Sequence, residues 1–287
     1  GGDDTITAGS GTKLVLGGDG GDIISLGIGS TNDHIVFGDN GTVSYVAMGL
    51  TGAGLPLRYE TTDTLEVTGG NDTITTGDGN NVILGGMGVD TITTGAGSDT
   101  ILGDNGFVQM DSEGNRFAQV GTQSQASTGG PIVGLGGDDV INSGSGDKTV
   151  LGGDGADRIT LLAGNHNVIG DNGTVTYGAL GAAGWGKALR FETTDTMQLT
   201  GGADTIVVGN GVNTILGGMG ADKITTVNGA DVIIGDNGFV QMDAVGDKLV
   251  QVETKSLDST TGSSFVAQLG GDDTITAGSG TKLVLGG

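Results

Sequence analysis

The chain repeats every nine residues over much of its length, and few sequence features restrict a fold as tightly as a short fixed period. Residues 68–103 read TGGNDTITT, GDGNNVILG, GMGVDTITT, GAGSDTILG, four nonapeptides in unbroken phase. Residues 200–235 and 135–170 keep the same frame, and residues 1–38 keep it with three residues inserted in the last nonapeptide. One apolar position of every nonapeptide is β-branched: Ile6, Val15, Ile24, Val36, Ile74, Ile83, Ile92, Ile101, Ile141, Val150, Ile159, Val168, Ile206, Ile215, Ile224 and Ile233.

Each nonapeptide predicts a very short strand between two tight turns, because a β-branched residue lies among polar ones with Gly-x-Gly on either side. Such turns need positive φ angles, which glycine adopts without steric cost. This need accounts for the 63 glycines among 287 residues. Two strands and two turns make a coil of about 18 residues, and stacked coils would hold parallel strands about 4.8 Å apart. We therefore expect an all-β parallel β-roll, or β-solenoid, whose thin Ile/Val core is buried only by stacking.

Longer repeats are superimposed on the nonapeptides. Residues 270–287 are identical to residues 1–18, and residues 152–157 (GGDGAD) answer residues 17–22 (GGDGGD) in the second half of the chain. Each half divides again into two blocks that end in Gly-Asp-Asn-Gly, at residues 38–41, 103–106, 170–173 and 235–238. We expect four units, each a nonapeptide block plus a spacer, at residues 1–67, 68–134, 135–199 and 200–268. Residues 269–287 would begin the next 269-residue repeat, so we expect the sequence to be an excerpt from a longer tandem series.

The spacers predict β-hairpins. Residues 42–67 alternate apolar and polar residues around a Gly-rich middle and return as residues 174–199, while residues 107–120 form a second type that returns as residues 239–253. These hairpins carry most of the few large side chains. Two interpretations stay open: the hairpins cap the thin core, or their exposed edges join one protomer to another.

Charge and missing motifs exclude several classes of protein. With 34 acidic against 11 basic residues the formal net charge is −23, which repels nucleic acid and anionic membranes and attracts cations. No 18-residue apolar run is present, so we expect no membrane insertion. Zero cysteines exclude disulfides and thiolate metal sites. No HExxH, no GxSxG with suitable partners and no phosphate-binding GK[ST] occurs, so we expect that the chain is not an enzyme.

The full motif GGxGxDxUx is present at residues 17–25 (GGDGGDIIS), 85–93 (GGMGVDTIT), 152–160 (GGDGADRIT) and 217–225 (GGMGADKIT). In these residues the chain resembles the RTX, or haemolysin-type, calcium-binding repeat family. The resemblance implies a parallel β-roll in which Ca²⁺ lies between successive coils. It also implies that backbone carbonyls of the glycine turns and the motif aspartates hold the ion.

The chemistry of the aspartates agrees with that expectation. Ca²⁺ takes six to eight oxygen ligands and accepts carbonyls together with carboxylates. Aspartates 18 residues apart would lie above one another on one edge of the roll, where they would repel each other without a cation. The alternative is that they are solvated turn residues. Four complete pairs are the first candidate ligands: Asp4/Asp22, Asp72/Asp90, Asp139/Asp157 and Asp204/Asp222.

The opposite edge departs from the motif. Its aspartate position holds Asn81/Asp99 and Asn213/Asp231 in the second and fourth blocks, which would make a weaker calcium site. It holds Lys13/His34 and Lys148/His166 in the first and third blocks, and there we expect an ammonium or imidazole hydrogen bond in place of calcium. A transition-metal or pH-sensing role for the two histidines is the alternative. Asp63 and Asp195 lie nine residues before the next motif and are candidate extra ligands.

The leading functional hypothesis is a calcium-stabilised structural segment of a large secreted or cell-surface protein, used as adhesin stalk, extracellular matrix or filament. Its expected partners are calcium ions and copies of itself, and the resemblance implies an extracellular location reached by type I secretion. One alternative is a threonine array that binds ice or another ordered surface, with Thr75/Thr93, Thr76/Thr94 and Thr7/Ser25 stacked 18 residues apart. Another is the repeat region of a secreted RTX enzyme or toxin.

Overall fold

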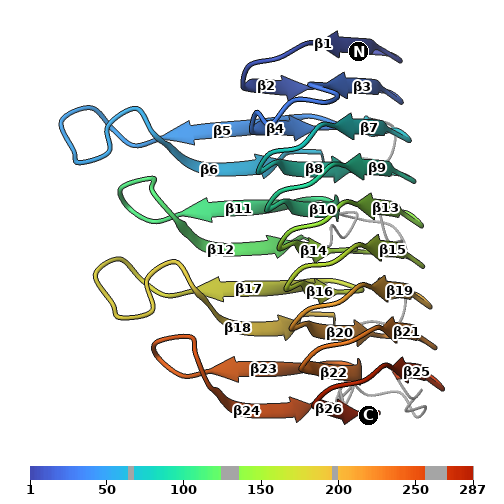
Figure 1. Cartoon of the computed structure of the whole chain (residues 1–287). Helices are drawn as coiled ribbons and strands as arrows, with labels where there is room; N and C mark the ends of the chain where they lie inside the picture. The colour runs from blue at the N-terminus through green and yellow to red at the C-terminus, as the bar shows by residue number, and fades with distance from the viewer. Residues whose placement is uncertain (64–67, 124–135, 196–199, 256–269, 287) are drawn as a thin grey trace, which may run out of the picture.

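The computed structural model describes residues 1–63, 68–123, 136–195, 200–255 and 270–286, and all regular elements within them are β-strands. The strands form three sheets, here named A, B and C, that run side by side along one axis (Figure 1). Among the described residues no helix is long and apolar enough to cross a membrane. The all-β parallel roll expected from the nonapeptides is confirmed.

Sheets A and B are parallel and each has nine strands. In stacking order, sheet A contains β1 (Thr5–Ala8), β3 (Ile23–Leu26), β7 (Thr73–Thr76), β9 (Thr91–Thr94), β13 (Val140–Ser143), β15 (Arg158–Leu161), β19 (Thr205–Val208), β21 (Lys223–Thr226) and β25 (Thr274–Ala277). Sheet B contains β2 (Lys13–Leu16), β4 (His34–Phe37), β8 (Val82–Gly86), β10 (Thr100–Asp104), β14 (Thr149–Leu151), β16 (Asn167–Ile169), β20 (Thr214–Gly218), β22 (Asp231–Asp236) and β26 (Lys282–Leu285). The chain alternates between the two sheets, so one strand of each makes a coil.

The register of sheet A continues without a break from block to block. Within a block, Ile6 lies opposite Ile24, one 18-residue coil further on. Across the first spacer, Ile24 lies opposite Ile74. The spacers are therefore excursions from one continuous roll. The predicted block boundaries at residues 67, 134, 199 and 268 lie outside the described residues.

The apolar column fills the space between sheets A and B. In β7 the side chains of Ile74 and Thr76 are buried, whereas Thr73 faces solvent, as the twofold alternation of a strand requires. The buried column is formed by Ile24, Leu26, Val36, Ile74, Ile83, Ile92, Ile101, Ile141, Val150, Ile159, Leu161, Val168, Ile206, Val208, Ile215, Ile224 and Ile233. Each coil adds only a few aliphatic side chains from its two strands, so each coil depends on its neighbours for burial.

The spacers form the predicted β-hairpins, and the four hairpins pair side by side into the antiparallel sheet C. Its strands are β5 (Gly41–Tyr45), β6 (Pro56–Thr61), β11 (Gly106–Met110), β12 (Phe117–Thr122), β17 (Gly173–Tyr177), β18 (Ala188–Thr193), β23 (Gly238–Met242) and β24 (Leu249–Thr254). One face of sheet C packs on sheet B in a second core that contains Phe37, Tyr59 and Phe191. The hairpins therefore cap the outer face of sheet B.

Candidate metal centre

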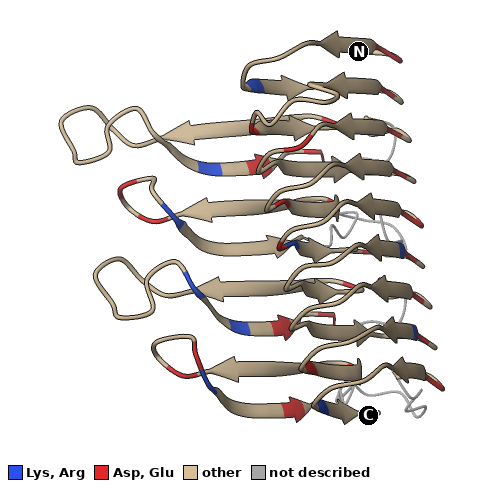
Figure 2. Cartoon of the chain, in the orientation of Figure 1, with Lys and Arg blue, Asp and Glu red and all other residues tan. Residues whose placement is uncertain are grey.

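The motif aspartates form one unbroken row along the edge where the strands of sheet A begin, here called the aspartate edge (Figure 2). The backbone N–H of each aspartate donates a hydrogen bond to Oδ1 of the aspartate in the next coil, at 2.6 to 3.0 Å. The row contains Asp4, Asp22, Asp72, Asp90, Asp139, Asp157, Asp204, Asp222 and Asp273. The same backbone-to-carboxylate hydrogen bond thus links adjacent coils eight times along the row.

The row joins the four predicted pairs and also connects them to one another. The additional steps are Asp22 to Asp72, Asp90 to Asp139, Asp157 to Asp204 and Asp222 to Asp273. Sequence reasoning missed these steps because their members are 47 to 51 residues apart. The spacing of 18 residues found only the steps inside a block.

One oxygen of each buried aspartate in this row has no hydrogen-bond partner. Oδ1 accepts the ladder bond, while Oδ2 is orphaned at Asp22, Asp72, Asp90, Asp139, Asp157, Asp204 and Asp222. Each of these oxygens faces a glycine carbonyl. At Gly85, for example, a side-chain Cβ would overlap both Asp90 Oδ2 and the carbonyl oxygen of Gly103. Because the glycine leaves this cradle open, a carboxylate oxygen and a carbonyl oxygen share a small space between two coils.

Burial makes the bare carboxylate row electrostatically unfavourable. Burial raises the pKa of Asp72 to about 7, of Asp204 to about 8 and of Asp222 to about 9. Burial, together with the negative charge of Asp139, raises the pKa of Asp90 and Asp157 well above the ordinary value. A divalent cation in the cradles would reverse this penalty, because it attracts the charged form of each carboxyl group.

The donor set fits calcium. Among the described residues no three His, Asp or Glu side chains converge on one point. Each coil interface therefore offers carboxylate oxygens supplemented by glycine carbonyls, and Ca²⁺ accepts this mixture of hard oxygen ligands. At the interface beside Gly85, the residues that would hold the ion are Asp90, through Oδ2, and Gly103, through its carbonyl oxygen.

A second set of acidic residues, from the Gly-Asp-Asn-Gly turns, lies beside the aspartate edge. Asp39 accepts hydrogen bonds from Met87 N at 2.6 Å and Gly70 N at 3.2 Å. Burial raises its pKa to about 8. The equivalent residues Asp104, Asp171 and Asp236 each accept a backbone N–H from the coil that follows the spacer. These hydrogen bonds link the coil before each spacer to the coil after it. The Gly-Asp-Asn-Gly motif is the sequence signal that marks these aspartates.

Asp63 and Asp195, the candidate extra ligands, lie at the base of the hairpins. Asp63 accepts hydrogen bonds from the backbone N and the Nδ2 of Asn40, at 2.9 and 3.1 Å. Asp195 makes the same two contacts with Asn172, at 2.9 and 3.0 Å. Each carboxylate thus ties the returning strand of a hairpin to the turn from which the hairpin started.

The opposite edge, where the strands of sheet B begin, is here called the mixed edge. Lys148 is fully buried and its Nζ lies 2.7 Å from Asp99 Oδ2, 2.6 Å from the carbonyl of Gly97 and 3.3 Å from that of Gly95. The ammonium group therefore occupies the position between coils where the family motif implies a calcium ion, as expected from the sequence. Lys282 repeats the arrangement, with Nζ 2.5 Å from Asp231 Oδ2 and 2.9 Å from the carbonyl of Gly229.

The four residues expected as a weaker calcium site have other partners in the structure. Asn81 Nδ2 donates to Asp99 Oδ1 at 2.9 Å, and Asn213 Nδ2 donates to Asp231 Oδ1 at the same distance. Both oxygens of each carboxylate are thereby engaged, one by an amide and one by an ammonium group. Burial alone would raise the pKa of Asp231, but the hydrogen bonds that it accepts from Lys282 and Asn213 lower the pKa below its usual value.

The two histidines are buried in the mixed edge, where their surroundings disfavour the charged form. Burial lowers the pKa of His34 and of His166, and the neighbouring Lys13 and Lys148 lower it further. His166 Nε2 contacts the carbonyl oxygen of Leu162 at 2.7 Å. In the described part of the chain neither histidine belongs to a group of three metal-ligating side chains.

The threonine array is only partly on the surface. Thr7 pairs with Ser25 and Thr75 with Thr93 on the outer face of sheet A. The expectation for Thr76 and Thr94 was wrong, since both are buried. They follow the inward-facing isoleucines by two residues, so the alternation of the strand turns them toward the core.

Comparison with known families agrees with this geometry. The model of the RTX calcium-binding nonapeptide repeat matches residues 59–92, 85–107, 133–165, 149–174, 192–224 and 209–240. Searches of curated proteins and of solved structures gave no significant match. The matched repeats contain six aspartates of the aspartate edge, Asp72, Asp90, Asp139, Asp157, Asp204 and Asp222, and such repeats bind calcium ions. Between residues 59 and 240 the chain thus carries several copies of the RTX calcium-binding nonapeptide repeat.

Proposed function

We propose that this chain is a calcium-stabilised structural segment of a large secreted or cell-surface protein, serving as adhesin stalk, matrix or filament material. RTX repeats imply a calcium-binding repeat region of a secreted protein. The proposal adds that this segment carries load or spans distance, and that it performs no catalysis itself. Copies of the same unit are its proposed neighbours.

The observation that carries the proposal is the unbroken aspartate row. Seven buried carboxylates each keep one oxygen without a partner, and these oxygens recur at every coil interface from Asp22 to Asp222. Eight calcium ions, one per step, would change the formal net charge from −23 to −7. Because the sites exist only when coils are stacked, the free energy of calcium binding would become free energy of folding.

This coupling suits a protein that must stay unfolded until it is exported. Extracellular calcium-binding modules have dissociation constants of about 10⁻⁴ to 10⁻³ M, far above cytosolic calcium levels. The roll would then form only outside the cell. A stack in which each coil contacts only its neighbours gives an elongated body, as a stalk or filament requires.

Calcium titration followed by native mass spectrometry and circular dichroism tests the proposal. We expect about eight ions per chain and loss of the β signal in chelator. Four ions would restrict the sites to the pairs within blocks. Asp139→Asn should remove at least one ion, whereas Asp138→Asn, an exposed neighbour in the same turn, should leave the count unchanged. Full β signal in chelator would exclude calcium-dependent folding.

A further inference from the structure

Sheet C contains one internal junction between the two halves of the chain and ends in two free edges. At the junction β12 pairs with β17, with Gln119 opposite Thr176, Val120 opposite Val175 and Gly121 opposite Thr174. Among the described strands, β5 pairs only with β6 and β24 only with β23. By sequence, β5 (GTVSY) is the counterpart of β17 (GTVTY), and β24 (LVQVET) is the counterpart of β12 (FAQVGT).

The internal junction is well packed. Val120 and Val175 are fully buried, and the rings of Phe117 and Tyr177 meet edge to face with centroids 5.7 Å apart. Further out, Trp185 Nε1 donates to Asp111 Oδ2 at 2.8 Å, which joins the tips of the two hairpins.

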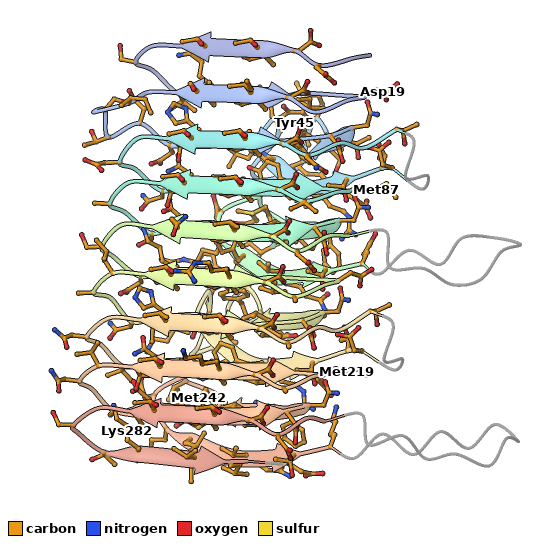
Figure 3. The ribbon with its side chains drawn as sticks, turned by 90° about the vertical axis from the view of Figure 1, so that its right-hand side faces the viewer. Asp19, Tyr45, Met87, Met219, Met242 and Lys282 are labelled. Atoms are coloured by element: carbon orange, nitrogen blue, oxygen red, sulfur yellow. The ribbon has the colours of Figure 1, made fainter. Side chains whose placement is uncertain are left out.

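The same positions are exposed at the two ends of the sheet. Tyr45, the counterpart of Tyr177, is 51% exposed, and Leu249, the counterpart of Phe117, is 41% exposed. Val250 beside it is 63% exposed. Tyr45 lies near the N-terminal end of the stack and Lys282 near the other (Figure 3). Each end of sheet C therefore exposes the counterpart of one side chain that is packed at the internal junction.

The last coil shows how a second copy would sit on the C-terminal end. Residues 270–286, which contain β25 and β26, repeat the sequence of the first coil and stack on β21 and β22. There Lys282 pairs with Asp231. Its counterpart in the first coil, Lys13, reaches only the carbonyls of Ser10 and Gly11, at 2.7 and 2.8 Å.

The spacing of the hairpins is also compatible with continuation. Two coils, β13/β14 and β15/β16, separate the hairpin that ends in β12 from the one that begins with β17. In a second copy whose first coil took the place of β25/β26, two coils would likewise separate β24 from the next β5. The edges of sheet C would then meet in the arrangement already seen at the junction.

We propose that the C-terminal face of one 269-residue unit binds the N-terminal face of a second copy, so that sheets A, B and C continue from one copy into the next. In this interface β24 pairs antiparallel with β5 of the second copy, with Gln251 opposite Ser44, Val252 opposite Val43 and Glu253 opposite Thr42. The register is that of the internal junction. Lys13 of the second copy takes the position of Lys282 on Asp231. This inference rests on the proposed function, because it requires a calcium-stabilised roll in both copies.

Disulfide trapping in a two-unit chain tests the register. The chain consists of residues 1–269 followed directly by residues 1–287, and it has no native cysteine to interfere. Gln251→Cys in the first unit is combined with Ser44→Cys in the second. Gln119→Cys with Thr176→Cys, both in the first unit, is the internal control, because these residues are opposite each other in the structure. Gln251→Cys with Thr42→Cys, two residues out of register, is the mismatched control.

We expect the Gln251/Ser44 pair to close within about threefold of the rate of the internal control, and at least tenfold faster than the mismatched pair. An internal pair that closes while the Gln251/Ser44 pair stays open would overturn the interface and leave the proposed function standing. Equal closure with Ser44 and Thr42 would overturn the register. Loss of all closure, with no calcium-dependent β signal, would overturn the proposed function and the interface together.

Discussion

Lys148 shows at the scale of one residue how the chain supplies its own cation between coils. Its Nζ and Asp99 Oδ2 are 2.7 Å apart and both side chains are inaccessible to solvent. Lys148→Met would leave the Asp99 carboxylate buried without its ammonium partner, although Thr94 Oγ1 still donates to it. Removing one member of a buried pair costs about 3–5 kcal/mol. We expect a loss of that size in the free energy of unfolding, measured by chemical denaturation in saturating calcium.

Two variants separate this effect from a general loss of lysine. Adding Asp99→Asn to Lys148→Met should recover part of the stability, because the uncompensated charge is then gone. Lys187→Met removes an ion pair with Asp247 whose side chains are 51% and 62% exposed, and exposed pairs contribute only about 0–1 kcal/mol. Equal losses for Lys148→Met and Lys187→Met would contradict the assignment of Lys148 as a substitute cation.

At the scale of the strand, the two copies of one valine provide a matched comparison. Val175 in β17 is fully buried between β12 and β18, whereas Val43 in β5 is only partly buried because β5 has one neighbour. Val175→Ala should cost about 2 kcal/mol, the transfer of two methylene equivalents plus a residual cavity. Val43→Ala should cost clearly less in the single chain. In the two-unit chain, Val43→Ala in the second unit should become as costly as Val175→Ala. Thermal denaturation of the three variants and their two parent chains decides this.

The strands of the roll could be predicted from sequence because their signals are local. Ile74 alternates with Thr73 within one strand, and Gly79 takes a φ of 129° in the turn between β7 and β8. The aspartate steps across spacers and the assembly of sheet C could not be predicted, since both depend on contacts between distant segments. Asp39, for example, accepts hydrogen bonds from residues 31 and 48 positions away. The position of Lys148 was predictable from the motif. Its ion pair with Asp99 was not, because the two residues meet only when the spacer between them leaves the roll and lets their coils stack.

Across the whole molecule, the two edges of the roll solve the same electrostatic problem differently. The aspartate edge needs cations from solution, while Lys148 and Lys282 give the mixed edge fixed positive charges. From β1 to β25 the strands of sheet A rise by eight steps, about 38 Å at the usual spacing between strands. Chelation should therefore act on one long side of the molecule and leave the ion pairs of the other side intact.

The same asymmetry sets the pH dependence of the calcium-free protein. An unfolded aspartate has a pKa of about 3.9, whereas burial raises the folded pKa of Asp72 to about 7 and that of Asp222 to about 9. The folded state thus keeps protons that the unfolded state releases. The stability that these protonated carboxyl groups contribute is fully present below about pH 4, the unfolded pKa. It is lost as the pH rises through the folded pKa values of Asp72 and Asp222. Without calcium we therefore expect a stronger β signal in circular dichroism at pH 5, where these carboxyl groups stay protonated, than at pH 8.

With saturating calcium the trend should reverse, because Ca²⁺ binds the deprotonated carboxylates and its affinity rises as they lose their protons. Asp139→Asn serves as the control for the row, since an amide has no proton to release in this range and should reduce the pH dependence in both conditions. A calcium-free protein that is more stable at pH 8 than at pH 5 would show that these carboxylates are ionised in the folded roll without a metal ion. The aspartate edge would then need another source of compensation for its charge.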